Sequence, residues 1–540
     1  MRLDDFLFDE SEMFDGIIRS KNIFKRNKVS TDKVLPKKIM YEQDITKLSD
    51  HKSEFKTEKM TVPVVFHVGE KLMPGEDTMK QLESVASNGC IFHHVAAMAD
   101  VHSKPGRKNA TGTTVTSENF ILPQVNDSDP ACGMRLVRLN LDDTTVTPEQ
   151  IDEIFKEATK TVPTKKFVGT ILPLRIITDI CRLGIQPLID YLDIKTKNEA
   201  ENSIDRGNFF KVAPTRKGIR DIIPPLFLFF AQFRAGIIGA AGNHFLDLMK
   251  VTDIIDPAVA EKFNLRKGQY VLMVHCGSGI LGQYTMYMFT AKKREHFSTA
   301  ILMNIGRFLW FTPYKQTIGR IAEKIRASDF GKKEPLITFD GAGEDGALYM
   351  SARNACSNFA HANRATITHN FVQTATKVLG RFVEADLLYD MPHILVSQEK
   401  HYDKDVWVHR NGTSRAYGPS KMSDHPTFKD TGEPAFIPTS MSTEAYLCVG
   451  QDGNDSSFYS CNHGAGKANK TSETVVPENK EALHEKLATR GVKLYNGQSS
   501  KVIEQDSSHY KRAEDVIESV VENNIVKPVV KLQPISVIMY

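Results

Sequence analysis

Residues 269–279, "QYVLMVHCGSG", form a short apolar run that ends in a glycine turn. An uninterrupted apolar run of this length, bounded by a turn signal, is typical of a buried strand. The pattern places His275 at the end of that strand, next to Cys276 and just before the glycines. The stretch therefore predicts a sheet in which the end of a buried strand carries a polar, chemically active side chain.

Patterns on both sides of this strand predict a mixture of helices and strands. In "TPEQIDEIFKEATK", Thr147 is placed to cap a helix, Pro148 takes its first position and Gln150 lies three residues after the cap. Gly380 is expected to end a long helix over 351–379. Further helices are expected at 79–86 and 317–328, and strands at 134–139, 445–450 and 534–539. These elements predict an α+β fold in one large domain.

The bulk composition narrows the class of protein. The chain has 540 residues and a net charge of +3, which indicates a globular protein with a large core. Residues 1–60 are rich in Lys, Asp and Glu, so we expect a charged N-terminal extension there and a single domain over 61–540. The most apolar run, 222–242, is broken by prolines, a glutamine and an arginine, which favours a buried core segment over a membrane span. The seven cysteines form no CxxC pair, so we expect free thiols in a reducing compartment, the cytoplasm.

Two glycine-rich loops look like nucleotide-binding motifs but miss their requirements. A Walker A loop would need a glycine at Cys461 and a hydroxyl residue at Ala468. The run "GAGEDG", 341–346, satisfies G-x-G-x-x-G, but its acidic residues would face a pyrophosphate, so we expect a tight turn before a helix. The same run is no K-x-D-G ligase motif, because Thr338 stands where the lysine would be.

Five polar residues lie in short segments that end an apolar run or enter a turn: Asp129, Cys132, His244, His275 and His393. A single histidine in such a place is more often a hydrogen-bonded structural residue than a ligand. If the five converge, they suffice for two metal ions bridged by the thiolate, and the ligand types alone favour zinc. Two neighbouring metal ions can clamp a phosphoryl group.

His463 stands directly before the glycines of "HGAGK". A neutral imidazole can attack a phosphate and hold the group as a phosphoramidate. The glycines would let backbone N–H groups approach phosphate oxygens, and Lys467 would add a positive charge. The alternatives are a further metal ligand or a histidine in an ordinary loop.

These segments belong to a longer series of motifs that occur in a characteristic order. The series is "MADVH", "DPACGMRL", "GNHFLDL", "VHCGSGILG", "NFAHANR", "YDMPH", "HRNGTSRAYGP", "STEAYLCVG", "CNHGAGKA" and "VVKLQPISVI". From about Val62 to the C-terminus, the chain resembles the RtcB family of GTP-dependent RNA ligases. The resemblance implies the α+β fold of that family and an RNA ligase that acts in tRNA splicing or RNA repair.

The resemblance also implies a chemistry and its partners. The enzyme would join RNA ends that carry a 3′-phosphate or a 2′,3′-cyclic phosphate to 5′-hydroxyl ends. One manganese ion would be held by Asp129, Cys132 and His244, and a second by Cys132, His275 and His393, so manganese replaces zinc. His463 would attack the α-phosphate of GTP and carry GMP. An activating helper protein is a further candidate partner, and we expect a monomer that does not bind a membrane.

The remaining site residues follow from the same resemblance. The contacts to GTP would come from Asn243, Phe245, Asp247, Pro438, Thr439, Ser440, Met441, Gly464, Ala465, Gly466 and Lys467. Candidates for RNA-phosphate contacts are Arg410, Arg415 and Lys470.

Several positions depart from the family pattern. They are Asp247 in place of glutamate, Asn411 in place of lysine, Ala445 in place of serine, Lys467 in place of arginine and Met539 in place of lysine. The changes fall on guanine and RNA contacts, where losing one charged contact costs on the order of 1.5–3 kcal/mol. An RNA-end-binding protein with a decayed guanylylation site is therefore an alternative. A two-metal phosphoesterase acting on RNA ends is a third.

Overall fold

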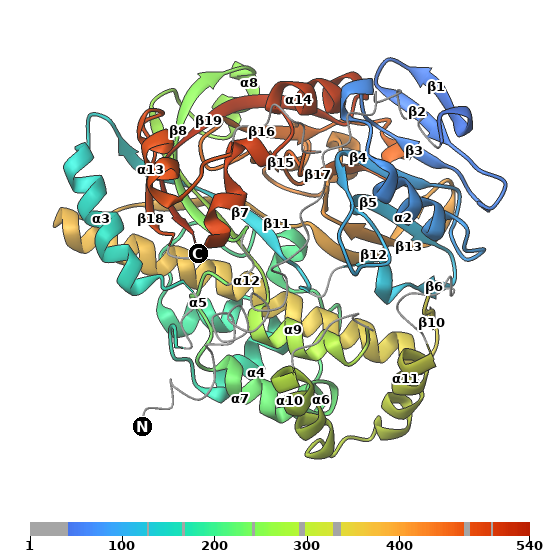
Figure 1. Ribbon diagram of the computed structural model, residues 1–540. Coiled ribbons are helices and arrows are strands. Elements are labelled where there is room, and N and C mark those ends of the chain that lie inside the picture. Colours follow the sequence, from blue (N-terminus) through green and yellow to red (C-terminus); the bar gives the residue numbers. More distant parts are fainter. Residues whose placement is uncertain are drawn as a thin grey trace, which may run out of the picture. The chain divides into compact units, whose positions relative to one another are not determined.

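The computed structural model describes residues 41–126, 129–164, 168–239, 243–290, 297–327, 336–468, 476–497 and 500–539. Contacts divide the chain into a unit of residues Met1–Glu42 and a unit of residues Gln43–Tyr540. The second unit is a mixed helical and stranded fold built on two large sheets (Figure 1). The predicted α+β class is confirmed.

The first sheet has seven strands, in the order β1-β2-β3-β4-β5-β13-β12. All of its neighbouring strands are antiparallel except β3 and β4, which are parallel. Their bounds are β1 Ile45–Ser49, β2 Lys52–Phe55, β3 Val64–Phe66, β4 Val95–His102, β5 Thr111–Ser117, β12 Ile394–His401 and β13 Lys404–Asn411.

The second sheet has eight strands, in the order β11-β7-β9-β8-β19-β16-β15, with β18 parallel to β19 beside this path. Its bounds are β7 Gly133–Asp142, β8 Phe245–Ile254, β9 Gln269–Cys276, β11 Ala385–Pro392, β15 Pro434–Ile437, β16 Ala445–Gly450, β18 Lys493–Asn496 and β19 Val526–Met539. Two small sheets pair β6 Phe120–Ile121 with β10 Phe339–Asp340 and β14 Thr413–Arg415 with β17 Ser460–Asn462.

The long helix α12, Glu344–Leu379, runs between the strands and a layer of helices (Figure 1). One apolar core lies between the second sheet, α3 and α12, and another lies among the helices around the first half of α12. Because both sides of α12 are covered, 23 of its 36 residues are buried. The other α-helices of the described residues are α2 Glu76–Ala86, α3 Pro148–Thr161, α4 Leu174–Leu183, α5 Gln186–Leu192, α6 Arg216–Ile222, α7 Pro225–Ala231, α8 Pro257–Lys262, α9 Gly279–Tyr287, α10 Phe297–Phe308, α11 Lys315–Ala327, α13 Lys480–Ala488 and α14 Ala513–Glu522.

The expected elements are present, with longer bounds in several cases. The capping box at α3 is formed in both directions, since Thr147 Oγ1 accepts from the Gln150 backbone and Gln150 Oε1 accepts from the Thr147 backbone. Helix α12 begins seven residues before the expected Ser351 and ends at Gly380, which has a left-handed φ of 63°. Residues 341–343 of the glycine run form the turn before α12, as expected, and residues 344–346 begin the helix itself.

The N-terminal part of the fold differs from the expectation. The extension was expected to reach residue 60, outside the core, but strands β1 and β2 continue the first sheet. Phe55 is fully buried and Met60 nearly so. These apolar side chains explain the difference, because the charge of the segment hides a pattern in which alternate residues of β2 face the core. Residues 1–40 lie outside the described residues.

Two further expectations concern the apolar run and the cysteines. Residues 225–231 of the apolar run form α7, where Phe227, Leu228 and Ala231 are buried. Among the described residues, no helix is both long and apolar enough to cross a bilayer. All seven cysteines are described, and none forms a disulfide.

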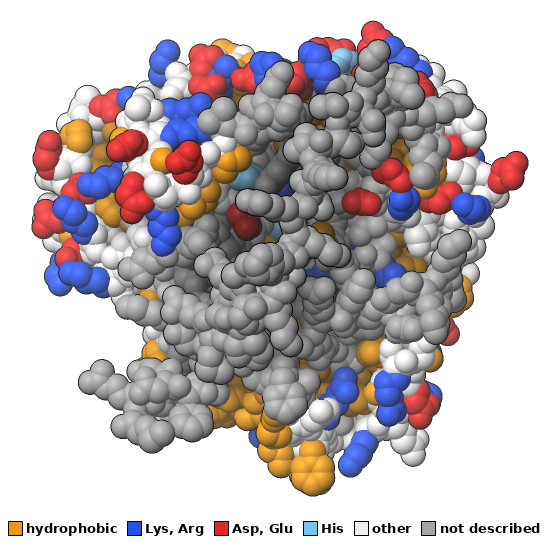
Figure 2. All heavy atoms as spheres, viewed as in Figure 1, with side chains coloured by type: hydrophobic (Ala, Val, Ile, Leu, Met, Phe, Trp, Pro, Cys, Tyr) orange, Lys and Arg blue, Asp and Glu red, His pale blue; other side chains and the backbone are white. Residues whose placement is uncertain are grey.

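On the described part of the face shown in Figure 2, acidic and basic side chains are interspersed, in keeping with the small net charge.

Candidate metal and nucleotide site

The ends of three adjacent strands bring the candidate metal ligands together. Cys132 directly precedes β7, His244 directly precedes β8, and His275 lies at the end of β9. Strand β9 lies between the other two and pairs with both, so that Met134 and Phe245 both face His275. The register therefore places the three ligand positions side by side.

The ligand atoms of these residues are within reach of a shared ion. Cys132 Sγ lies 3.2 Å from His244 Nε2 and 3.5 Å from His275 Nε2. His393 follows β11, and its Nε2 lies 3.4 Å from His275 Nε2. All four side chains are buried, and Cys132, His244 and His275 form a group of ligand atoms that lie within 4.8 Å of one another.

Asp129 completes the cluster from the loop before β7. Its Oδ2 lies 3.8 Å from His244 Nε2, while its Oδ1 accepts hydrogen bonds from the backbone N–H and the hydroxyl of Ser278, at 2.8 and 2.7 Å. Gly277 lies against this carboxylate so closely that a Cβ there would overlap it. Ser278 thus fixes Asp129 Oδ1, and Asp129 Oδ2 faces His244.

The electrostatics of the cluster suit a cation. Burial, with the neighbouring cationic groups, holds the pKa values of His275 and His393 well below the usual range, so both imidazoles are neutral at pH 7. Burial raises the pKa of Cys132 to about 11. Burial would also lower the pKa of His244, but the thiols of Cys132 and Cys276 outweigh it and raise that pKa well above its usual range. A cation would displace these protons, because ligand binding requires the thiolate and the neutral imidazole.

His463 lies beside the cluster but has different partners. Its ring centroid is 4.3 Å from that of His393. Its Nδ1 lies 2.7 Å from Asp100 Oδ2 and 2.7 Å from the carbonyl oxygen of Gly412. Asp100 is fully buried, whereas the His463 side chain is 16% exposed. Since both partners of Nδ1 are acceptors, the proton belongs on Nδ1 and the lone pair on Nε2.

The glycines after His463 meet the loop that precedes β16. The Ala465 N–H donates to the Pro438 carbonyl at 3.1 Å, which places residues 464–466 beside residues 438–441. Gly466 has a φ of +74° and packs against the Asp100 backbone, so a side chain there would be both strained and obstructed. In the second loop, Ser440 Oγ and Thr439 Oγ1 are both bonded to Thr443 Oγ1.

The candidate nucleotide contacts at the start of β8 and just before it lie near the metal ligands in the chain. The Asn243 carbonyl accepts from His275 Nδ1–H at 2.8 Å, which fixes that imidazole with Nε2 toward the cluster. The Phe245 ring packs edge-on against His275 at a centroid distance of 5.4 Å. Asp247 is buried, its Oδ1 has no hydrogen-bond partner among the described residues, and burial raises its pKa well above the usual range.

Two lysines next to the glycine loop are directed away from it. Lys467 Nζ donates to the Glu504 carbonyl and lies 4.1 Å above the Tyr510 ring. Lys511 Nζ donates to the carbonyls of Ala99 and Val101, at 2.7 and 3.0 Å, on either side of Asp100. Lys511 thus holds the backbone around Asp100, the partner of His463, whereas Lys467 holds the backbone at Glu504.

The predicted RNA-phosphate residues are not brought together. Arg410 is fully buried, and its guanidinium donates to Glu399, Ser460 Oγ and the Phe458 carbonyl. This burial contradicts a phosphate contact for Arg410, because its donors are already used inside the fold. Arg415 is paired with Glu433. Together with Arg206 and Lys421, it lines a small pocket of about 240 Å³. Lys470 lies outside the described residues.

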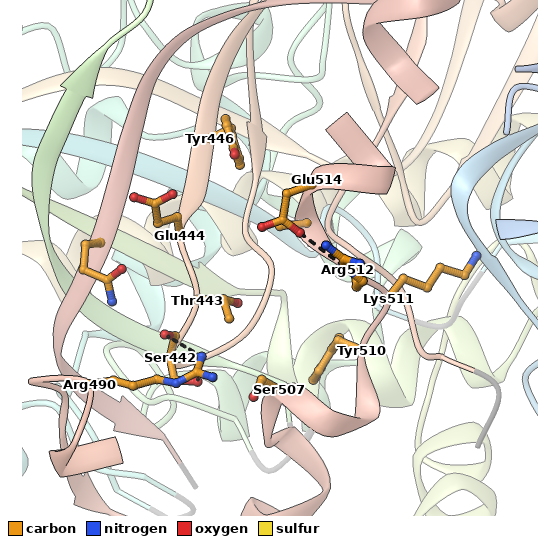
Figure 3. Close-up of a pocket in the computed structure, with 12 residues that line it drawn as sticks. Ser442, Thr443, Glu444, Tyr446, Arg490, Ser507, Tyr510, Lys511, Arg512 and Glu514 are labelled. Atoms are coloured by element: carbon orange, nitrogen blue, oxygen red, sulfur yellow. Dashed lines mark hydrogen bonds and ion pairs between the residues drawn. The ribbon is translucent and has the colours of Figure 1, made fainter. Parts of the chain in front are cut away.

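A larger pocket of about 540 Å³ adjoins the glycine loop but contains neither His463 nor a metal ligand (Figure 3). It opens beside the 438–441 loop, and the Lys511 N–H in its wall donates to the Gly466 carbonyl. Figure 3 shows Ser442 and Arg490 on one side and Tyr510 to Glu514 on the other, with the Lys511 chain extending away. Its lining residues are Ser442, Thr443, Glu444, Tyr446, Arg490, Ser507, Tyr510, Lys511, Arg512, Ala513, Glu514 and Gln533.

Sequence reasoning missed three residues that support the site. Asp100 could have been suspected, because it is an acidic residue in an otherwise apolar strand, "VAAMADVH". Ser278 follows Gly277 in the motif that contains His275, but its bond to Asp129 spans 149 residues. No signal singles out Lys511, whose contacts with the chain around Asp100 span more than 400 residues.

Comparisons with known proteins agree with this arrangement of motifs. The family described as tRNA-splicing ligase RtcB matches residues 81–540. A tRNA-splicing ligase RtcB of Archaeoglobus fulgidus is 27% identical over 522 residues, covering 91% of this chain and 98% of that protein. Those of Methanococcus maripaludis and Thermococcus kodakarensis are 26% and 27% identical, each covering 89% of this chain and 95% of the relative.

Proposed function

The chain belongs to the RtcB family, and from that premise we propose that it is an RNA ligase that uses GTP and manganese. It joins RNA ends that carry a 3′-phosphate or a cyclic phosphate to 5′-hydroxyl ends, in tRNA splicing or RNA repair. The observation that carries the proposal is the position of His463: its ring lies against His393 of the metal cluster, and Asp100 holds its other nitrogen.

The residues of the cluster fit two metal ions. Asp129, Cys132 and His244 would hold one ion, and Cys132, His275 and His393 the other, so that the thiolate is shared. The Asp129 carboxylate suits manganese, whereas the thiolate and the imidazoles alone would favour zinc, so the choice of manganese follows from membership of the family. Two ions would supply charge stabilisation for a phosphoryl group and lower the pKa of a bound water. Asn243 supports this role, because its carbonyl keeps His275 Nε2 turned toward the cluster.

His463 would act as the nucleophile. With its proton held on Nδ1 by Asp100 and Gly412, it presents the Nε2 lone pair to the α-phosphorus of GTP. The N–P bond forms as the bond to the leaving pyrophosphate breaks, and Asp100 stabilises the positive charge that develops on the imidazole. His463 then passes GMP to the RNA 3′-phosphate, and a 5′-hydroxyl end displaces GMP as the RNA ends are joined. A cyclic phosphate is first opened by hydrolysis.

The nucleotide would lie between the two loops next to His463. The N–H groups of Gly464 and Gly466 would face phosphate oxygens, while the Ala465 N–H holds the loop to Pro438. The adjoining 540 Å³ pocket has room for the nucleoside. Asp247 Oδ1 is buried without a partner among the described residues, and a guanine N–H group would give this oxygen the partner it lacks.

A labelling experiment tests the proposal. Incubation with α-labelled GTP and Mn²⁺ should transfer label to the protein as an acid-labile adduct. The adduct should disappear in His463→Ala, while Mn²⁺ binding persists. Unlabelled ATP should compete less well than unlabelled GTP. If the wild-type protein forms no adduct with any nucleotide in the presence of Mn²⁺, the ligase proposal fails.

An RNA-end-binding protein without guanylylation is the second candidate, and specific contacts favour it. Arg410 is buried, the Asn411 amide donates to the Ala110 carbonyl, and Lys467 is bonded to Glu504, so these positions place no cation toward the glycine loop. This candidate predicts RNA binding without an adduct. A phosphoesterase would instead release phosphate from RNA ends without GTP.

A further inference from the structure

The motif "NFAHANR", residues 358–364, has no part in the steps described above, yet it lies in the most buried stretch of α12. Asn363 and Arg364 are nearly or fully buried, although a polar side chain is costly to bury without partners. Both side chains reach out of the helix to the strand ends that carry the candidate metal ligands.

Arg364 connects two of these strand ends. Its Nη1 donates to the carbonyl of Ala131 at 2.7 Å and to the carbonyl of Cys276 at 2.8 Å. Ala131 directly precedes Cys132, and Cys276 directly follows His275. One guanidinium nitrogen therefore sets the distance between the chain segments that carry the thiolate and one of its histidines.

Asn363 holds the next part of the same loop. Its Nδ2 donates to the Gly277 carbonyl at 3.0 Å and to Cys276 Sγ at 3.3 Å, and its Oδ1 accepts from the Gly236 N–H at 2.9 Å. Cys276 Sγ in turn lies 3.7 Å from His244 Nδ1. Asn363 therefore contacts His244 indirectly, through the Cys276 thiol. It also holds Gly277, which packs against the Asp129 carboxylate.

The chain next to Cys132 is strained and held from several directions. Ala131 has a φ of +54°, a left-handed conformation that costs a non-glycine residue on the order of 1 kcal/mol or more. Besides the bond from Arg364, the Ala131 N–H donates to the Ile394 carbonyl at 3.0 Å, and the Cys132 carbonyl accepts from the backbone N–H of His393 at 2.8 Å. Such a conformation persists only when the surroundings impose it, and Arg364 supplies one of these restraints.

The charge of Arg364 is balanced inside the core. Its Nε lies 3.0 and 3.2 Å from the two Asp390 oxygens. A second buried arginine, Arg135, pairs with Glu199 at 2.6 Å and lies 3.7 Å from Asp390. The cluster thus contains two cations and two carboxylates, but only Arg364 also donates to carbonyls next to the candidate ligands.

We propose that Arg364 and Asn363 are positioning residues that set the geometry of the metal cluster by fixing the backbone of residues 131–132 and 276–277. The inference rests on the proposed metal site. Arg364 and Asn363 would not bind the metal ions themselves but would hold the chain next to the residues that do. The guanidinium fork is required for this, because a lysine has the same charge but cannot reach Asp390 and two carbonyls in fixed directions.

The test compares two conservative variants of the same buried cluster. Arg364→Lys should weaken Mn²⁺ binding by roughly 10- to 100-fold, as for other residues that orient metal ligands. Arg135→Lys is the matched control, since the Arg135 side chain is buried in the same cluster but donates to Glu199 rather than to the carbonyls of Ala131 and Cys276, and it should leave Mn²⁺ affinity unchanged. Calorimetric Mn²⁺ titration and the thiolate-to-metal absorption of the Co²⁺-substituted protein are the readouts, with thermal unfolding measured in parallel.

A second variant guards against misfolding of Arg364→Lys. Asn363→Ala removes the donors to Gly277 and Cys276 without leaving a buried charge, and it should weaken Mn²⁺ binding and shift the Co²⁺ spectrum. The positioning role is overturned if both variants bind Mn²⁺ as the wild type does, or if Arg135→Lys weakens binding equally. A wild-type protein that binds no Mn²⁺ would instead overturn the proposed metal site.

Discussion

At the residue scale, His463 is distinguished from the neighbouring histidines by the carboxylate behind it. His244, His275 and His393 face one another and Cys132, whereas His463 Nδ1 faces Asp100 and Gly412. A histidine with one nitrogen fixed in this way is suited to nucleophilic attack through the other.

Replacing Asp100 with Asn should slow the transfer of GMP to His463. The imidazole would lose the charge that stabilises its cationic form, although Gly412 still accepts the Nδ1 proton, so we expect a loss on the order of 10²-fold. Single-turnover labelling with α-labelled GTP measures the rate, and Mn²⁺ affinity serves as the control because Asp100 is no metal ligand. An unchanged labelling rate would exclude a role for Asp100 in the attack.

Gly277→Ala should disrupt the metal cluster. The added methyl group would overlap the Asp129 carboxylate and force it away from His244. We expect Mn²⁺ binding to weaken by about tenfold or more, measured by calorimetric titration. Gly319→Ala in α11 is the control, because a Cβ there meets open space and should leave binding unchanged. Equal binding by both variants would contradict the predicted position of Asp129.

Lys511 should give the stability of the protein a characteristic pH dependence. Burial lowers its pKa to about 8 from the ordinary 10.5. Between these values the unfolded chain binds a proton that the folded chain lacks, so rising pH favours folding by about 1.4 kcal/mol per unit.

The comparison is with Lys511→Met, which has no titrating group at this position. As pH rises from 8 toward 10, the wild-type protein should gain unfolding free energy relative to the variant, in denaturant titrations at each pH. A pH-independent difference would show that burial does not lower the pKa of Lys511.

At the element scale, the edge strand β12 and its neighbour β13 depend on an internal ion pair. Arg410 of β13 and Glu399 of β12 are both buried, and His401 Nε2 also lies 3.0 Å from Glu399. The ion pair joins the two strands of the hairpin. Arg410 Nε also donates to Ser460 Oγ, at the start of strand β17, which directly precedes His463.

Arg410→Met should therefore act on stability. Removing one partner leaves the buried Glu399 carboxylate uncompensated, which costs about 3–5 kcal/mol of unfolding free energy. Replacing both Arg410 and Glu399 with Met should recover part of this loss in chemical denaturation. If Arg410→Met instead kept full stability and lost RNA affinity, the result would support the original prediction that Arg410 contacts an RNA phosphate.

At the scale of the whole molecule, the boundary of the folded unit decides which truncations are tolerated. A chain that begins at Thr61 lacks β1 and β2 and the buried Phe55, whereas a chain that begins at Gln43 keeps them. We expect the shorter chain to unfold at a lower temperature, because burying one Phe side chain contributes roughly 1.5–3 kcal/mol. Equal thermal midpoints would place residues 43–60 outside the core, as their charge had indicated.

Local signals were sufficient for most elements. The cap of α3, the end of α12 at Gly380 and the strand that carries His275 follow from short-range patterns, and all three are present. Strand β2 was not predicted, because its few core-facing residues lie in a charged segment. The burial of Arg410 was not predicted either, since its partner Glu399 lies on another strand.

The sequence by itself determined the types of the candidate ligands, the order of the motifs and hence the family. It could not establish convergence, because Cys132 and His244 are 112 residues apart, and His463 and Asp100 are 363 apart. Only the tertiary structure decided that three strand ends meet at one cluster, that Asp100 lies behind His463, and that Lys467 and Arg410 turn elsewhere. The physical reason is that composition and periodicity act over a few residues, whereas a site is set by strand register and by buried polar groups such as Arg364 that must find partners across the fold.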